Sequence, residues 1–161
     1  MKHLRWIGLL VLFLAVIVVA LVRVGSPWSD LKRKHATSEP LPPDAARWHR
    51  IACISAHGRG AFTIGGMSWA LRDQSVYLGL PAPLSWFSNG ASVPLSAVGG
   101  CRRLRWGDGR RETQLWFREA GVAATLRDQD DTVLKWCRAH ELPILSSEEF
   151  YAELQAQRQA R

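Results

Sequence analysis

Five arginines lie within one stretch of the chain, CRRLRWGDGRRETQLWF, on either side of a Gly-Asp-Gly turn. They are Arg102, Arg103, Arg105, Arg110 and Arg111. A guanidinium group matches a phosphate or carboxylate through paired hydrogen bonds, and several together raise the local concentration of anions. The chemistry that this stretch offers is therefore anion binding.

Alternation predicts how these arginines divide between the two faces of a hairpin. In a strand over residues 101–106, Arg103 and Arg105 share one face and Arg102 lies on the other. Arg110 and Arg111 then lie at the tip, so four cations gather near one end. We expect Arg103, Arg105, Arg110 and Arg111 to contact an anionic surface or partner.

The alternative is that the arginines only protect an exposed edge strand from pairing with another sheet. Asp108, Glu112 and Glu119 would then partly neutralise them. Nucleic acid is not expected as a partner, because base stacking needs exposed aromatic side chains beside the cations and only Trp106 is placed for it.

A second contact surface is predicted in the loop PAPLSWFSNG, where Trp86 and Phe87 lie between proline and Asn-Gly. Large apolar side chains in a turn can enter a membrane interface or a groove on a partner. The alternative is a strand in which Trp86 packs inward.

Cysteine and histidine offer the remaining reactive groups. Cys53 with His57, and Cys137 with His140, are pairs that could ligate zinc or supply a thiol nucleophile. Their spacing is not that of a zinc finger, and the apolar face of a helix explains Cys137 and His140 equally well. We expect no catalytic residue, metal or cofactor, and keep a small metal- or thiol-dependent enzyme as the alternative. Three cysteines cannot all pair, so a disulfide framework is not expected, and a reducing compartment is weakly favoured.

Short apolar runs separated by turn residues predict the elements that position these groups. Alternation as in TQLWF, with turns such as SNG and GDG, is typical of a small antiparallel β structure. The predicted strands cover residues 48–55, 68–71, 76–80, 91–95, 101–106, 113–117 and 122–127.

Two helices are predicted after the last strand. In DQDDTVLKWCRAH, four residues recur on one face, with Asp130 or Asp131 as N-cap, and Pro143 ends the pattern. The second helix begins with a capping box of Ser146 and Glu149, and Leu145 and Phe150 occupy the positions of a hydrophobic staple.

An apolar run from residue 6 to residue 22, WIGLLVLFLAVIVVALV, precedes the predicted β region. With its flanks it approaches the roughly 20 residues that a membrane-spanning helix needs. We therefore expect residues 4–24 to form a single helix that spans the inner (plasma) membrane. A cleaved secretory signal is the alternative, although its apolar region would be shorter and a small-residue cleavage motif is missing.

Basic residues flank both ends of this run. Lys2 and Arg5 precede it, whereas Arg23, Lys32, Arg33 and Lys34 follow it. Counting these charges places the C-terminal domain in the cytoplasm. The short basic N-terminus is also typical of an anchor whose N-terminus lies in the cytoplasm. Such an anchor would place the C-terminal domain on the opposite side of the membrane.

Composition limits the class of protein. The chain has 161 residues, 47% of them hydrophobic, and a net charge of +7. Removing Lys2, Arg5 and Arg23 from the 21 basic residues leaves 18 against 14 acidic ones, so residues 24–161 carry only +4. This excludes a disordered chain and does not indicate a nucleic-acid-binding face.

Seven short strands followed by an amphipathic helix with a tryptophan resemble the pleckstrin-homology-like (PH-like) domains that bacteria attach to a membrane segment. The runs MSWALRDQSVYLGLPAPL, ASVPLSAVGG, TQLWF and VAATLRDQDDTVLKWCRAHELPI carry the resemblance, and Trp136 is its strongest match. It implies a bent barrel closed by a helix, which binds or scaffolds without catalysis. Lipid-binding members hold the head group at the first hairpin. Here that hairpin is ISAHGRGAFTIGG, which adds Arg59 to the predicted anionic contacts but has no dense basic run.

The sequence thus predicts an α+β chain with a transmembrane helix, a seven-stranded antiparallel PH-like barrel and a closing C-terminal helix. Its expected divisions are an anchor with basic flank at 1–24, a juxtamembrane linker at 25–46, the PH-like domain at 47–145 and a helical tail at 146–161. Its expected function is non-catalytic contact with a protein partner or an anionic membrane surface.

Overall fold

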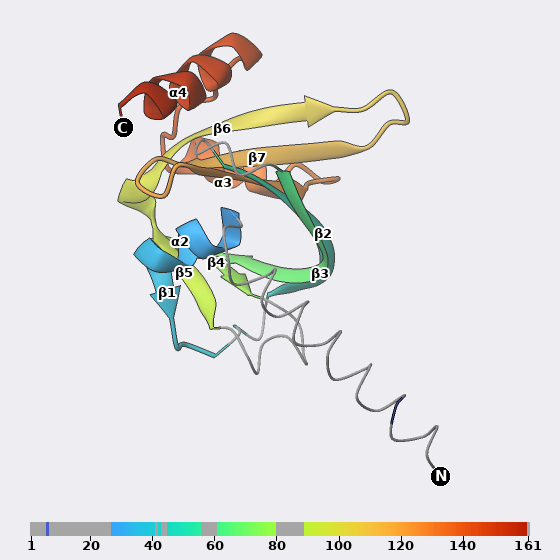
Figure 1. The fold of residues 1–161 in the computed structure, drawn as a ribbon. Helices are drawn as coiled ribbons and strands as arrows, with labels where there is room; N and C mark the ends of the chain where they lie inside the picture. The colour runs from blue at the N-terminus through green and yellow to red at the C-terminus, as the bar shows by residue number, and fades with distance from the viewer. Residues whose placement is uncertain are drawn as a thin grey trace.

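The computed structural model of this chain describes residues 6, 27–40, 42, 45–55, 61–79 and 89–160. Within these residues the fold is α+β (Figure 1). The strands are β1 (Ala36–Thr37), β2 (Ala46–Ser55), β3 (Ala61–Leu71), β4 (Ser75–Gly79), β5 (Gly90–Pro94), β6 (Val98–Arg105), β7 (Arg111–Phe117) and β8 (Val122–Arg127). The helices are α2 (Pro27–His35), α3 (Thr132–Ala139) and α4 (Ser147–Gln159), with a short 3-10 turn, η2, over Leu95–Ala97.

The strands form one bent antiparallel sheet in the order β1-β5-β4-β3-β2-β8-β7-β6. The two-residue strand β1 adds to the seven predicted strands, which correspond to β2 through β8. The expectation of a closed barrel is wrong, because among the described strands β6 and β1 stand at opposite ends of the order and pair with one neighbouring strand each.

Strand alternation predicted the strands closely. The seven observed strands overlap the predicted ranges, and β8 coincides with its predicted range. The main difference is β3, which begins at Ala61 and so includes residues with little apolar alternation. Pairing with β2 extends the strand to Ala61, whereas β4 pairs only with Ser68–Leu71.

Helix α2 corrects the interpretation of residues 25–46 as a linker. Trp28 and Leu31 of α2 are fully buried in the main hydrophobic core, together with Met67 of β3 and Val93 of β5. Figure 1 shows α2 lying inside the bend of the sheet. The segment around Pro27–His35 is therefore part of the folded domain.

Helices α3 and α4 lie on opposite faces of the β6–β7–β8 part of the sheet. Val133 and Cys137 of α3 are buried in the main core with Leu115 and Leu126, which are inward-facing residues of β7 and β8. Phe150 and Leu154 of α4 form a second cluster with Trp116 and Ala123, whose side chains point to the outer face. In Figure 1, α4 lies outside β6 and β7, and α3 lies beneath them.

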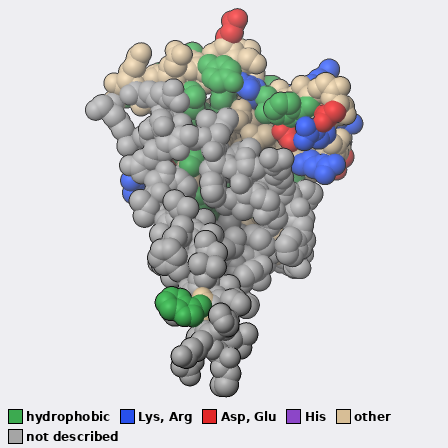
Figure 2. Space-filling view, turned by 45° about the vertical axis from the view of Figure 1, so that its right-hand side comes forward, with side chains coloured by type: hydrophobic (Ala, Val, Ile, Leu, Met, Phe, Trp, Pro, Cys, Tyr) green, Lys and Arg blue, Asp and Glu red, His purple; other side chains and the backbone are tan. Residues whose placement is uncertain are grey.

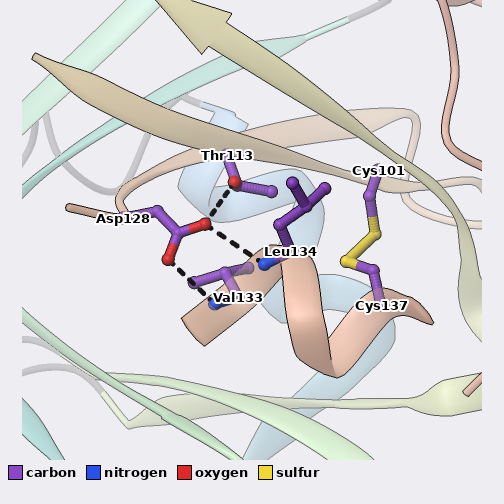
Figure 3. The surroundings of a disulfide bond; sticks show 6 residues. All are labelled: Cys101, Thr113, Asp128, Val133, Leu134 and Cys137. Carbon is purple, nitrogen blue, oxygen red and sulfur yellow. Dashed lines mark hydrogen bonds between the residues drawn. A yellow bond between two sulfur atoms is a disulfide. The ribbon is translucent and has the colours of Figure 1, made fainter. Parts of the chain in front are cut away.

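Asp128 starts helix α3. Its side chain is buried and accepts hydrogen bonds from the backbone N–H of Val133 (2.9 Å), from that of Leu134 (3.1 Å) and from the Thr113 hydroxyl (2.5 Å; Figure 3). Asp131 occupies the predicted N-cap position with φ 61°, but its side chain does not cap the helix. The carboxylate that caps α3 is therefore two residues before Asp130 and three before Asp131, the two predicted candidates.

A disulfide joins Cys101 of β6 to Cys137 of α3 (Figure 3). The sequence predicted that a disulfide framework is absent, and it did not predict this single pair. An odd number of cysteines shows only that at least one thiol stays unpaired, and it does not prevent the other two from meeting in the fold.

The second predicted helix is confirmed at its start. Ser146 accepts from the Glu149 backbone N–H, and the Glu149 carboxylate accepts from the Ser146 backbone N–H. Phe150 is buried, and Leu145 packs against its cluster.

Within the described residues, no helix is long and apolar enough to cross a membrane. The predicted anchor at residues 4–24 lies, apart from Trp6, outside the described residues.

Candidate functional site

The arginine hairpin, defined as residues 101–117, consists of β6, β7 and the turn between them. Its register pairs Cys101 with Leu115, Arg103 with Thr113, and Arg105 with Arg111. Because Cys101 and Leu115 face the main core, Arg103, Arg105 and Arg111 point to the same face further along the hairpin. The predicted sharing of one face by Arg103 and Arg105 is confirmed.

Two arginines of this face share one carboxylate. The Arg103 guanidinium pairs with one Asp131 oxygen, and Nη1 of Arg111 lies 3.4 Å from the other. Asp131 was predicted as a helix cap and not as an arginine partner. Only the packing of α3 beside β6 and β7 brings it there.

Arg105 stands directly opposite Arg111 in the register. Arg105 is exposed, and no acidic side chain of the described residues lies within ion-pair distance of it. Like charges directly opposite on one sheet face destabilise the pairing. The two guanidinium groups therefore form a site whose electrostatics favour an external anion.

The turn of the hairpin carries an exposed tryptophan. Trp106 is 50% exposed, and its indole N–H donates to Glu112 over 2.8 Å. The Arg110 guanidinium lies 5.8 Å from the centre of the Trp106 ring. Gly109, with φ 80°, takes the left-handed conformation that this turn requires.

Asp108 neutralises Arg110 at the tip. Its carboxylate accepts from the Arg110 backbone N–H at 3.1 Å and from Arg110 Nε at 2.5 Å. These hydrogen bonds lower the pKa of the Asp108 carboxyl, and the bond from the Arg110 backbone N–H has the largest effect. The carboxyl therefore stays ionised near neutral pH. Figure 2 shows basic and acidic side chains intermixed in this part of the surface, at the upper right of the view.

The four arginines therefore gather at one end, as predicted, but the prediction did not include Asp131 among the acidic side chains that neutralise them. Asp108 and Asp131 pair with three of them, and Glu112 lies beside them. Glu119, expected to help neutralise the cluster, acts instead on His35. The hairpin tip, residues 105–111, therefore combines three arginines with one aspartate around the exposed Trp106.

Arg102 points to the opposite face, as predicted, and is buried beneath α4. The structure describes no part of the other predicted contacts: Arg59, Trp86 and Phe87 lie outside the described residues. Those three predictions stay predictions.

The disulfide removes one of the two Cys/His pairs that could have ligated a metal or supplied a thiol nucleophile, namely Cys137 with His140. Cys137 is bonded to Cys101, so it offers no free thiolate, and His140 packs its ring 4.9 Å from that of Trp136. Among the described residues, no group of three or more histidine, cysteine or acidic side chains could hold a metal ion. Cys53 and His57 are not placed as a pair, because His57 lies outside the described residues.

Trp136, the strongest single match of the resemblance, is partly buried against the main core. Its indole N–H donates to the Arg72 backbone carbonyl, 3.0 Å away in the turn between β3 and β4. Comparison with protein-family models, curated protein sequences and solved structures finds no match for this chain.

Proposed function

We propose that this chain is a membrane-anchored, PH-like binding module without catalytic activity, and that its hairpin tip contacts an anionic membrane surface or a protein partner. Seven antiparallel strands followed by a helix that contacts the core through Trp136 support the PH-like assignment. The apolar run over residues 6–22 supports the anchor.

One observation supports the hairpin tip as the contact surface. Arg105 and Arg111 oppose each other on one face of the hairpin, beside the exposed Trp106. An anion between the two guanidinium groups would relieve their repulsion. Tryptophan and arginine are also the residues that most often dominate binding energy at protein interfaces. The hairpin tip thus combines charge for attraction with an aromatic group for close contact.

The disulfide supports a different orientation from the cytoplasmic one that the charge count favours. Disulfides form and persist in oxidising compartments and are rare in the cytoplasm. We therefore place the folded domain outside the cytoplasm, with the basic N-terminus inside. A C-terminal alkaline phosphatase fusion should be active in this orientation, and an inactive fusion at normal expression would reverse it.

Arg105→Glu tests the contact surface. The new carboxylate faces Arg111, so the variant should be more stable than the wild type by about 0.2–1 kcal/mol while binding falls. Arg118→Glu makes the same charge change at an exposed position outside the hairpin and is the matched control.

The assay uses the full-length chain in nanodiscs of neutral lipid and measures capture of vesicles that contain phosphatidylglycerol. Each cation near an anionic surface contributes about 1 kcal/mol, so the two-unit charge change should weaken capture roughly 30-fold. Added salt should weaken it further. Equal capture by both variants would exclude the hairpin tip as the membrane contact.

A protein partner is the second candidate, favoured by the acidic residues among the arginines at the tip. A bare anionic surface gains little from an intermixed pattern, whereas a partner can match it charge by charge. Trp106→Ala distinguishes the two candidates. It should abolish capture of a protein partner in pull-downs from detergent extracts and should change vesicle capture much less.

A further inference from the structure

Arg102 of β6 is a buried cation. It is 9% exposed, and its Nε and Nη1 atoms are buried without a hydrogen-bond partner. The guanidinium carbon lies 4.7 Å from the centre of the Phe150 ring and 5.0 Å from that of Tyr151, both in α4. No acidic side chain of the described part of the chain forms an ion pair with it.

The two aromatic rings do not satisfy this group completely. Ring contacts stabilise the positive charge. The N–H donors of a guanidinium, however, lie in its plane and point outward from its edge. Buried donors without an acceptor are rare in folded proteins, so each one needs an explanation. Here the donors without an acceptor are on the guanidinium of Arg102, which carries a full positive charge. A water molecule could accept their hydrogen bonds but could not neutralise that charge.

Two neighbours of Arg102 also have unsatisfied polar atoms. Gln114 stands directly opposite on β7, donates from Nε2 to the Thr125 hydroxyl at 3.0 Å, and leaves Oε1 without a partner. Trp116 lies two residues further on the same face, and its indole N–H has no partner. Both side chains are about 99% buried. Three unsatisfied side chains therefore lie on one sheet face beneath one helix.

We propose that these residues form a binding site for a phosphate group, carried by a lipid or free in solution. Phosphate oxygens would accept from the edge of Arg102 and from the Trp116 indole. If the Gln114 amide turns over, its Nε2 donates to the same anion while its Oε1 accepts from the Thr125 hydroxyl. Donors from three side chains suit a phosphate group, which offers up to four acceptor oxygens, better than a carboxylate, which offers two.

Access to this site depends on α4. Of the two rings against the guanidinium, Phe150 is 1% exposed and Tyr151 is 51% exposed, so a ligand from solvent would enter past Tyr151. Glu149, a nearby carboxylate of α4, is held in the capping box by Ser146 and does not supply the counter-ion. The site is separate from the hairpin tip, because Arg102 and Arg105 point to opposite faces of β6.

The test is a titration of the full-length chain in phosphatidylcholine nanodiscs with inorganic phosphate at constant ionic strength. The readouts are the NMR signals of the Trp116 indole N–H and the Arg102 Nε–H. A second arm replaces part of the neutral lipid with phosphatidylglycerol. We expect saturable shifts of both signals, with free phosphate if the ligand is soluble and with the anionic lipid if it is a head group.

Arg102→Met keeps the stem between the two rings and removes the donors. It should weaken binding about 10- to 100-fold, as expected for charge-assisted hydrogen bonds. Arg127→Met, an exposed position on the same sheet face, is the matched control and should bind as the wild type does. Arg102→Lys, which keeps the charge with a single nitrogen, replaces the methionine variant if that does not fold and should also bind more weakly.

Two results would overturn the proposal. One is that neither signal moves in either arm. The other is that the Arg102 variants bind phosphate or anionic lipid as tightly as the Arg127→Met control.

Discussion

Removal of the disulfide should destabilise the domain by an amount that follows from its position in the chain. Cys101 and Cys137 are 36 residues apart. Closing a loop of this length in the unfolded chain corresponds to about 4 kcal/mol of stabilisation. The backbone around Cys101 has further ties that the substitution leaves in place, because Cys101 N–H donates to the Pro143 carbonyl at 2.8 Å and Leu145 N–H donates to the Cys101 carbonyl at 2.7 Å. The loss should therefore come mainly from the unfolded state.

The assay compares thermal unfolding of the full-length chain, followed by tryptophan fluorescence, in three forms. These are the oxidised wild type, the reduced wild type and the Cys101→Ala/Cys137→Ala variant. The last two should unfold about 10 °C below the first, since 1 kcal/mol corresponds to a few degrees in a domain of this size. Cys53→Ala is the control and should keep the difference between oxidised and reduced forms.

Thiol counting gives the result that would refute this reasoning. The chain has three cysteines, so protein isolated without reductant should carry one free thiol, that of Cys53. Three free thiols per chain in freshly isolated protein would show that the disulfide does not form in the cell. The orientation that we propose on its basis would then fall as well.

Three further predictions concern the packing of the domain, at Asp128, Gly90 and His35. Asp128→Ala should lower the free energy of unfolding by about 3 kcal/mol, because it removes the cap of α3 and leaves buried donors unsatisfied. Asp128→Asn should cost less in the same denaturant titration. Gly90→Ala should cost about 1–3 kcal/mol, because a Cβ there would lie 2.5 Å from the Tyr77 hydroxyl oxygen, whereas Gly107→Ala, with open space around it, should cost much less. His35→Gln should remove part of the loss of stability between pH 7 and pH 5.

The sign of the His35 effect follows from its burial. Desolvation lowers the pKa of His35 below 6.5, Glu119 opposes this shift, and Lys34 adds to it. The unfolded chain therefore binds a proton more readily than the folded one below about pH 6.5, and stability should fall as the pH decreases through that region. Identical pH dependence in wild type and His35→Gln would contradict this. For the other two predictions, the contradicting results are equal stabilities of Asp128→Ala and wild type, and equal effects of Gly90→Ala and Gly107→Ala.

Strands were predictable here because alternation and turn residues are local signals. Helix α2 was missed because Pro27–His35 is short and mostly polar, and its two core residues, Trp28 and Leu31, are too few to show a period. The buried face of α2 is apparent only once the bent sheet surrounds it. The pairing of Cys101 with Cys137 was missed for a similar reason, since sequence spacing gives no distance between a strand and a helix.

The candidate site was predictable only in part. Alternation placed Arg103 and Arg105 on one face and Arg102 on the other, as observed. It could not supply the ion-pair partner, because Asp131 reaches the hairpin through the packing of α3. Nor could it show that Arg102 has no ion-pair partner among the residues that the structure describes, since α4 and its aromatic rings are some 50 residues further along the chain.

Strand β6 links these findings, because successive residues of this strand bind different helices. Cys101 is bonded to α3 on the inner face, and Arg102 packs against α4 on the outer face. A shift of the register by one residue would turn the half-cystine outward and bury the cation in the apolar core, so this register is strongly specified. The base of the hairpin is thus held from both sides, while Trp106 and Arg105 lie beyond both contacts and are exposed. A hairpin that is held at its base from both sides loses less conformational entropy on binding than an unsupported segment of the same length. This favours the hairpin tip as the place where the domain meets its partner.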